Sequence, residues 1–143
     1  PDLKDVVSKA NLTPDEVIAL HTSRILEVAI MGFLPGLGYL TGVDDALHLP
    51  RRSVPRTFVP QGSVGLAMDQ TVIYPLNSPG GWNLIGRMPI PLFDQKRENP
   101  ILFSAGDQVS FYAVNADKYE ELAASCVDGN LPICPEQADE AAL

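Results

Sequence analysis

The residues best suited to chemistry in this chain include a histidine and an arginine that each border a turn. His21 follows a predicted helix, where its imidazole can act as a base, donate a hydrogen bond to an anion, or simply end the helix favourably. Arg56 closes the run R-R-S-V-P-R that begins at residue 51 and leads directly into a predicted strand. An arginine on a rigid loop can bind a carboxylate or phosphate through paired hydrogen bonds, whereas Arg51 and Arg52 fit a solvated loop equally well. We take His21 and Arg56 as the candidate catalytic residues.

Two glycine-rich segments point to a binding site. Residues 32–40 read G-F-L-P-G-L-G-Y-L, and residues 78–82 read S-P-G-G-W. Glycine adopts φ values that other residues avoid and lets a backbone or a ligand come close. The first segment is apolar, so we expect it to pack under a barrel or to line a pocket, and not to form a helix or a plain strand. In the second segment, backbone N–H groups can form an anion nest, and Trp82 can stack on a planar ligand, although tryptophan is more often a core residue.

Further polar groups flank a predicted strand between these segments. Gln70 offers an amide and Tyr74 a hydroxyl to a small polar ligand. Strand ends converge at the mouth of a barrel, so we expect His21, Arg56 and the binding residues to meet in one pocket. The candidate substrate-binding residues are Gln70, Tyr74, Pro79, Gly80, Gly81 and Trp82. No metal site is predicted, because the two histidines have no partner at metal-ligand spacing.

Composition bounds the class of protein. A chain of 143 residues suits one domain, and a net charge of −8 disfavours nucleic-acid binding. Basic residues nevertheless concentrate in the middle, where six of them lie from Arg51 to Arg97 beside two acidic ones. The apolar stretches are too short to span a membrane, and no secretory signal opens the chain. Two cysteines, Cys126 and Cys134, are read as free thiols in a reducing cytoplasm, so we expect a cytoplasmic protein without a membrane partner.

Turn signals and periodicity predict a mainly β fold with helices at both ends. Asp2 can cap a first helix, and Thr13-Pro14-Asp15-Glu16 is a capping box for a second helix that ends near His21. A last helix is expected from about Asn115, and residues 136–143 are expected to be disordered. Many short strands between glycines and prolines indicate a closed or nearly closed barrel. The expected strands are Ile25–Met31, Arg56–Val59, Ser63–Met68, Thr71–Tyr74, Trp82–Arg87 and Gln108–Val114, with a tight hairpin at Asp69-Gln70.

The order of these motifs resembles a known family. The run is His21-Thr22, the segment 32–40, P-R-R-x-x-P-R-x-x-V-P-x-G-S-V-G from residue 50, Gln70-Thr71, Tyr74-Pro75, S-P-G-G-W, and L-I-G-R from residue 84. It is similar to the allophanate hydrolase subunit 1 family, which includes the kinase A inhibitor of sporulation and the B component of bacterial 5-oxoprolinase. The resemblance implies a cyclophilin-like β-barrel over residues 1–135, as the C-terminal domain of a longer protein whose N-terminal domain is absent. By matching positions it also implies a pocket formed by His21, Arg56, Gln70, Tyr74 and the loop 79–82.

The resemblance further implies an activity. We expect one subunit of an ATP-dependent hydrolase that cleaves the C–N bond of a small amide or lactam, of the 5-oxoprolinase or allophanate hydrolase type, and that is inactive alone. The expected partner is a related second subunit, of the type of allophanate hydrolase subunit 2 or of the C component of 5-oxoprolinase. ATP would be used by the complex, with no metal or tightly bound cofactor. The alternatives are an inhibitor that docks on a histidine kinase through the exposed loop 33–40, and the carboxyltransferase part of urea amidolyase.

Overall fold

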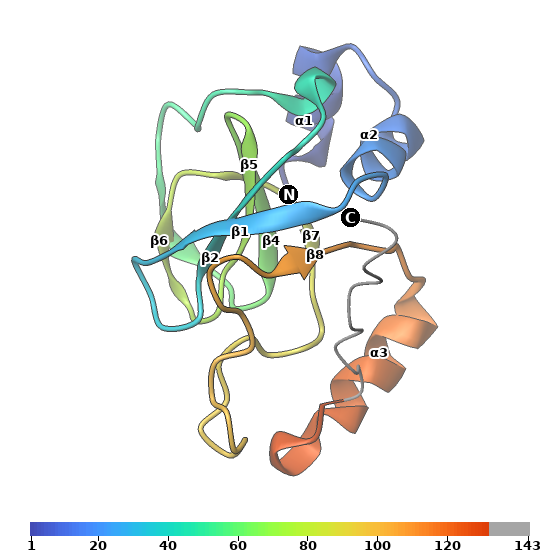
Figure 1. Ribbon diagram of the computed structural model, residues 1–143. Coiled ribbons are helices and arrows are strands. Elements are labelled where there is room, and N and C mark those ends of the chain that lie inside the picture. Colours follow the sequence, from blue (N-terminus) through green and yellow to red (C-terminus); the bar gives the residue numbers. More distant parts are fainter. Residues whose placement is uncertain (132–143) are drawn as a thin grey trace, which may run out of the picture.

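Two short helices open the chain, and the signals that start and end them are visible in the structure. The structure, a computed structural model, describes residues 1–131. Helix α1 (Leu3–Ala10) ends at Asn11, whose φ of 54° is left-handed. Helix α2 (Pro14–His21) carries the predicted capping box: the Glu16 N–H donates to Thr13 Oγ1 at 3.2 Å, and the Thr13 N–H donates to the Glu16 carboxylate at 2.7 Å. Both helices lie together at one end of the molecule (Figure 1).

The strands form one large and one small antiparallel sheet. The large sheet has six strands in the order β7-β4-β5-β2-β1-β8, and the small sheet pairs β3 with β6. The predicted mainly β fold with short helices at both ends is therefore confirmed. The strands are β1 (Leu26–Met31), β2 (Gly38–Thr41), β3 (Arg56–Val59), β4 (Ser63–Ala67), β5 (Gln70–Ile73), β6 (Ser78–Gly80), β7 (Asn83–Arg87) and β8 (Gln108–Val109).

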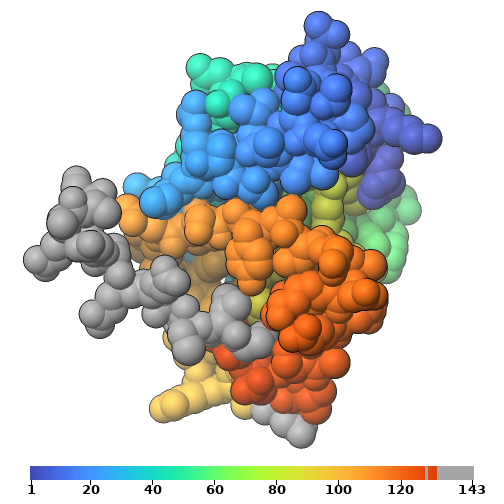
Figure 2. All heavy atoms as spheres, turned by 90° about the vertical axis from the view of Figure 1, so that its right-hand side faces the viewer, coloured from blue at the N-terminus to red at the C-terminus, as the bar shows by residue number. Residues whose placement is uncertain are grey.

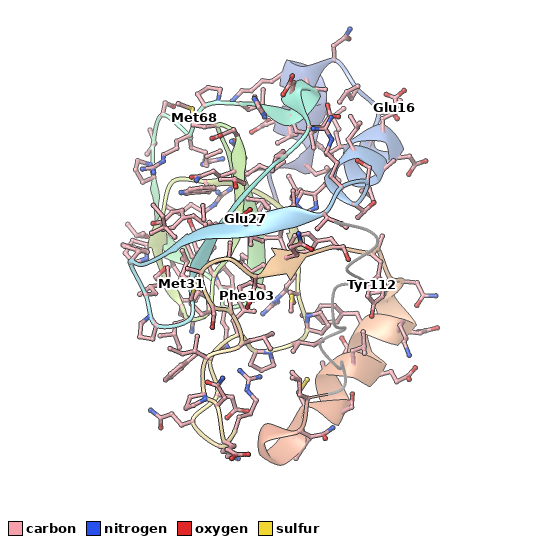
Figure 3. The ribbon with its side chains drawn as sticks, viewed as in Figure 1. Glu16, Glu27, Met31, Met68, Phe103 and Tyr112 are labelled. Carbon is pink, nitrogen blue, oxygen red and sulfur yellow. The ribbon has the colours of Figure 1, made fainter. Side chains whose placement is uncertain are left out.

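Two strands lie where the sequence predicted only loops. The expectation that segment 32–40 holds no plain strand is wrong for its second half, because β2 begins at Gly38. A Cβ on Gly38 would lie 3.1 Å from Val28 Cγ1 and 3.3 Å from both Met31 Sδ and Phe103, so glycine lets β2 approach these side chains closely. Figure 3 shows Met31 and Phe103 near each other beside the sheet. Strand β6 includes Pro79, which an edge strand tolerates.

Two other predicted elements differ at their ends. The tight hairpin joins β4 to β5 as expected, but its turn is Met68-Asp69, one residue earlier than predicted, with Ala67 opposite Gln70. Met68 has a φ of 56° and stands exposed at the end of the sheet away from Met31 (Figure 3). Strand β8 has two residues instead of seven, because only Gln108 and Val109 pair with β1. The expected disorder of residues 136–143, like Cys134, lies outside the described residues.

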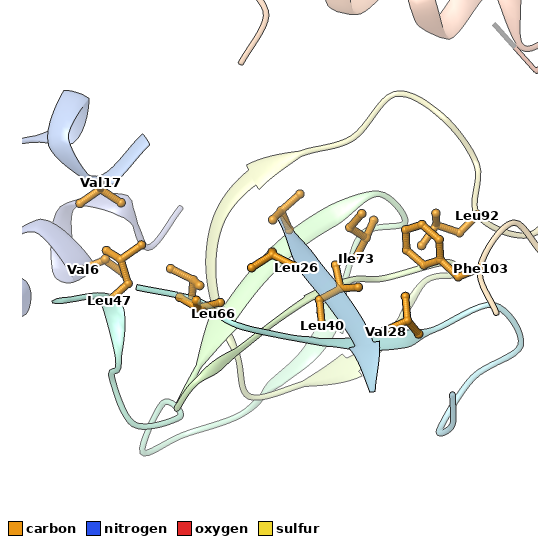
Figure 4. Close-up of a cluster of buried hydrophobic side chains, with 12 residues drawn as sticks. Val6, Val17, Leu26, Val28, Leu40, Leu47, Leu66, Ile73, Leu92 and Phe103 are labelled. Carbon is orange, nitrogen blue, oxygen red and sulfur yellow. The ribbon is translucent and has the colours of Figure 1, made fainter. Parts of the chain in front are cut away.

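The core runs along the concave side of the sheet and continues beneath the helices. Figure 4 shows Val6, Val17 and Leu47 at the helical end and Leu92 and Phe103 at the other end of one continuous cluster. Leu47 belongs to the short helix η1 (Asp45–Leu47), which packs against α1 and α2. A second, smaller cluster surrounds Trp82 and Tyr74. The glycine-rich segments therefore lie over their own small core, separate from the main one.

The chain ends its described part on a helix that stands apart from the first two. Helix α3 (Ala116–Ser125) begins as predicted, with the Lys118 N–H donating to the Asn115 side chain at 2.8 Å, and η2 (Val127–Gly129) follows it. In Figure 2 this segment covers the face below the N-terminal helices. Within residues 1–131, no helix has the length and apolar character that crossing a membrane requires.

Asp2 fastens the first helix to the sheet and does not cap that helix with its side chain. The Asp2 carboxylate is 2% exposed and accepts hydrogen bonds from Arg52, from both terminal nitrogens of Arg56, and from the Leu84 N–H at 2.7 Å. Its own N–H donates to the Leu84 carbonyl at 2.9 Å. The expected side-chain cap is therefore corrected: two guanidinium groups compete for this carboxylate and win, because charge-assisted hydrogen bonds exceed a neutral cap in strength.

We predict that Asp2→Asn lowers the free energy of unfolding by about 2–4 kcal/mol, because it leaves two partly buried guanidinium groups without a counter-ion. Burial raises the pKa of Asp2, but the hydrogen bonds from Arg56 and Leu84 and both positive charges outweigh it and hold that pKa below 3.8. This stabilisation is therefore complete above pH 3.8 and is lost as the pH falls through the folded-state pKa. Urea unfolding at pH 7 measures the effect. Asp5→Asn, on the exposed side of α1, is the control, and equal losses in both variants would contradict the prediction.

Candidate functional site

The two glycine-rich segments form the walls of one pocket of about 130 Å³. Segment 32–40 and the start of β2 supply one wall, and the loop that joins β6 to β7 supplies the other. Val72 and Tyr74, from β5 and the residues after it, form the floor. The lining residues are Phe33, Leu37, Tyr39, Arg51, Val72, Tyr74, Gly80, Gly81 and Trp82.

Tyr74 is held in this pocket by the absence of a side chain at Gly80. The Tyr74 ring is buried, and its hydroxyl occupies the space in which a Cβ on Gly80 would lie. Burial raises the pKa of Tyr74, while a backbone hydrogen bond with Trp82 and the charge of Arg51 act in the opposite direction without cancelling the increase. Tyr74 is therefore a neutral phenol at physiological pH, able to donate a hydrogen bond to a ligand.

Arg51 brings the positive charge to this pocket. Its guanidinium carbon lies 5.6 Å from the centroid of the Trp82 ring, within the range of a cation–π interaction. Two backbone-directed hydrogen bonds fix its loop: the Arg52 N–H donates to the Gly81 carbonyl at 2.8 Å, and the Asn83 amide donates to the Pro50 carbonyl at 2.9 Å. Arg51 forms no ion pair with any residue in the range 1–131. Its charge is therefore free to bind an anionic group.

Arg56, one of the two expected catalytic residues, has a different environment. Its guanidinium is bound to the Asp2 carboxylate in a two-pronged contact and does not line the pocket. The Asp2 hydrogen bond also raises the pKa of Arg56. The predicted anion clamp therefore exists, but its anion is an internal carboxylate, and we revise the role of Arg56 to a structural one.

His21, the other expected catalytic residue, is buried between α2 and the sheet. Its Nε2 lies 3.0 Å from Thr71 Oγ1, and its ring centroid lies 4.8 Å from that of Phe111. The Thr71 hydroxyl donates its only proton to the Gly65 carbonyl at 2.9 Å, so the hydrogen bond with His21 requires a proton on Nε2. Burial lowers the pKa of His21 to about 4, which keeps the ring neutral. The structure does not bring His21 to the pocket, and we revise its role to a structural one.

The remaining expected residues divide into two groups. Tyr74, Gly80, Gly81 and Trp82 lie together in the pocket, whereas Gln70 begins β5 opposite Ala67, and Pro79 is exposed on β6. Neither Gln70 nor Pro79 is among the lining residues. The geometry thus separates the strand ends that the sequence placed at one mouth, because β5 runs from the hairpin at Met68-Asp69 toward Tyr74 and only its last residues reach the pocket.

Sequence reasoning missed the residue that supplies the pocket's charge. The three arginines of the loop 51–56 differ in sequence only in their neighbours, and the strand after Arg56 favoured the wrong one. The signal for Asp2 as the partner of Arg52 and Arg56 is a contact across 50 and 54 positions, which no local pattern carries. Tyr39 lies 6.0 Å from Trp82 between ring centroids and was part of the expected glycine-rich wall, although it received no role.

Comparisons with known proteins agree on one family. The family model described as carboxyltransferase domain, subdomain C and D, matches residues 1–103. The chain is 48% identical over 110 residues to the B component of 5-oxoprolinase from Haemophilus influenzae, with 77% of this chain and 52% of the relative covered. It is 43% identical over 119 residues to the same component from Bacillus subtilis, with 83% and 50% covered. The chain thus spans about half the length of these curated relatives.

A solved structure extends the agreement to the fold. A conserved uncharacterized protein from Pyrococcus horikoshii is 39% identical and superposes with a TM-score of 0.79. The match covers 83% of this chain and 55% of that one.

We predict that the His21 imidazole controls stability in mildly acidic solution. Its folded-state pKa of about 4 lies below the ordinary 6.5, so the unfolded chain binds more protons between these pH values and stability falls as the pH drops through this window. The loss should approach about 1.4 kcal/mol per pH unit. His21→Gln keeps a donor for Thr71 without a titrating group, so its unfolding free energy should be nearly flat from pH 6.5 to 4.5. Parallel slopes in urea titrations of both proteins would show that His21 does not titrate in this way.

We predict that alanine is tolerated at Gly81 but not at Gly80. A Cβ on Gly80 would overlap the Tyr74 hydroxyl, whereas the nearest atoms to a Cβ on Gly81 are those of Pro55 at 3.7 Å. Gly80→Ala should therefore cost about 1–3 kcal/mol of stability, and Gly81→Ala should leave it within about 0.5 kcal/mol. Thermal unfolding of the two variants measures the difference. Adding Tyr74→Phe to Gly80→Ala should recover part of the loss, and equal melting temperatures for the two glycine variants would refute the contact.

Proposed function

The chain belongs to the family of the carboxyltransferase domain, subdomain C and D, which confirms the family resemblance found in its motifs, and on this premise we propose that it forms part of a 5-oxoprolinase-type subunit. In this proposal the subunit acts within an ATP-dependent complex that hydrolyses the C–N bond of a small lactam. The chain matches the B component of 5-oxoprolinase in two organisms at 43–48% identity, and this similarity supports the type of reaction.

One observation in the structure carries the proposal: a free guanidinium, an indole face and a neutral phenol meet over one small pocket. A lactam that bears a carboxylate presents a planar ring, a negative charge and an amide oxygen. Trp82 offers a flat surface to the ring, Arg51 offers charge to the carboxylate, and the Tyr74 hydroxyl offers a proton to the amide oxygen. The three groups thus match the three features of such a substrate.

The proposal divides the work between this chain and the rest of the complex. A pocket of about 130 Å³ is smaller than the roughly 300–1,000 Å³ of sites that enclose larger ligands, so we assign ATP to another part of the complex. The buried, neutral His21 and the Asp2-bound Arg56 stabilise the fold that holds the pocket. In this proposal a related second subunit, of the type of the 5-oxoprolinase C component, completes the active site, and the isolated chain is inactive.

A regulatory role is the second candidate, and one observation favours it. Phe33 is 67% exposed at the tip of segment 32–40, beside exposed Pro35. An inhibitor that docks on a histidine kinase needs such an apolar tip on its surface. The pocket beside this tip favours the enzyme role, because a docking surface has no need of a charged concavity.

We predict that Arg51→Met weakens substrate binding in the reconstituted complex without unfolding the protein. Loss of one charge-assisted contact of about 1.5–3 kcal/mol should raise the KM for 5-oxoproline at least about tenfold. Steady-state ATP hydrolysis dependent on 5-oxoproline measures the effect, with the isolated chain as the blank. Arg24→Met removes an exposed arginine that pairs with Asp44 away from the pocket, so it serves as the matched control.

Two outcomes would contradict the proposed function. An Arg51→Met complex with unchanged KM would remove Arg51 from the substrate site. A complex that hydrolyses 5-oxoproline fully without this chain, together with inhibition of histidine-kinase autophosphorylation by the chain alone, would favour the regulatory role.

A further inference from the structure

A second pocket lies on the other side of Tyr74 and has no part in the proposed function. Its volume is about 170 Å³, larger than that of the Trp82 pocket. Its apolar lining comes from Ile73, from Leu92 and from the segment 88–91, which follows β7. The polar lining comes from three separate places in the chain: Gln61 between β3 and β4, Arg87 at the end of β7, and Tyr119 on α3. Polar groups that converge on an apolar concavity from distant segments are typical of binding sites.

The backbone around this pocket is tightly tied. Gly62 has a φ of 84°, and a Cβ there would lie 2.6 Å from the Met88 carbonyl oxygen, so only glycine fits. The Gly62 N–H donates to the Tyr74 carbonyl at 2.7 Å, and the Met88 N–H donates to the Gly62 carbonyl at 2.7 Å. The Gln61 N–H donates to the Asn77 side chain at 2.8 Å. The wall that bears Gln61 and Arg87 is thus fixed before any ligand arrives, which lowers the entropy cost of binding.

The charge at this pocket is positive and uncompensated. Arg87 lies opposite Ser63 in the β4–β7 ladder and forms no ion pair or side-chain hydrogen bond with any residue of the described chain. The lining includes no aspartate or glutamate. The neighbouring groups, the Gln61 amide and the Tyr119 phenol, are neutral hydrogen-bond donors and acceptors. This combination suits an anion that has two oxygens for the planar guanidinium and a short apolar part for Ile90 and Leu92.

We propose that this second pocket, between the end of β7 and α3, is a binding site for a small aliphatic carboxylate. Arg87 binds the carboxylate through two parallel hydrogen bonds, Gln61 and Tyr119 supply further hydrogen bonds, and the apolar lining contacts the hydrocarbon part. The site is independent of the Trp82 pocket, because the only lining residue that the two pockets share is Tyr74.

Isobutyrate is the probe that tests this site, and isobutyramide is its neutral counterpart of nearly equal shape. Titration of the nitrogen-15-labelled chain with isobutyrate should give saturable shifts at the amides of Gly62, Met88 and Tyr119, with a Kd of about 1 mM, as expected for a ligand of few atoms. Isobutyramide should bind at least about tenfold more weakly, because it lacks the charge that Arg87 recognises.

Two variants make the test specific. Arg87→Met should raise the Kd for isobutyrate at least about tenfold, and Tyr119→Phe should raise it about threefold. Arg51→Met, in the other pocket, should leave it unchanged. The proposal is overturned by the absence of saturable shifts, by equal binding of the acid and the amide, by wild-type affinity in Arg87→Met, or by shifts confined to the amides of Gly81 and Trp82. Because Arg87 is exposed, its replacement should leave the rest of the amide spectrum in place.

Discussion

The burial of one carboxylate organises the part of the molecule that carries the candidate site. Asp2 draws Arg52, Arg56 and the Leu84 backbone to a single point, and these groups belong to the loop before β3, to β3 itself and to β7. A buried charge is tolerated only when its hydrogen-bonding capacity is filled, so these segments must arrive together. The same constraint holds the arginine loop against the Gly81 segment and leaves Arg51 directed over Trp82.

A second constraint, the contact between Tyr74 and Gly80, shapes the space around that loop. The Tyr74 ring occupies the volume that a side chain at Gly80 would need, and it stands between the two pockets of the described chain. Its burial keeps the phenol protonated. One residue thus supplies a hydrogen-bond donor to the first pocket and a wall to the second, so the two pockets are structurally linked although their charges come from different arginines.

The positive middle of an acidic chain acquires a different meaning in the structure. Arg52 and Arg56 share one carboxylate, which neutralises only part of their charge, and Arg51 and Arg87 have no counter-ion within residues 1–131. Each of these two lines a separate pocket. A surplus of positive charge around two concavities raises the local concentration of small anions, even though the net charge of the whole chain is −8.

The sequence by itself determined the elements whose signals are local. The capping box at Thr13, the start of α3 at Asn115 and most strands follow from neighbouring residues, and the ordered motifs were enough to identify the family. Only the tertiary structure decided which arginine faces the pocket and which is consumed by Asp2, because that choice depends on a contact 54 positions away. It also decided that His21 is a buried, neutral donor to Thr71. A residue type fixes which chemistry is available, but burial and partners, which come from distant segments, fix which chemistry remains.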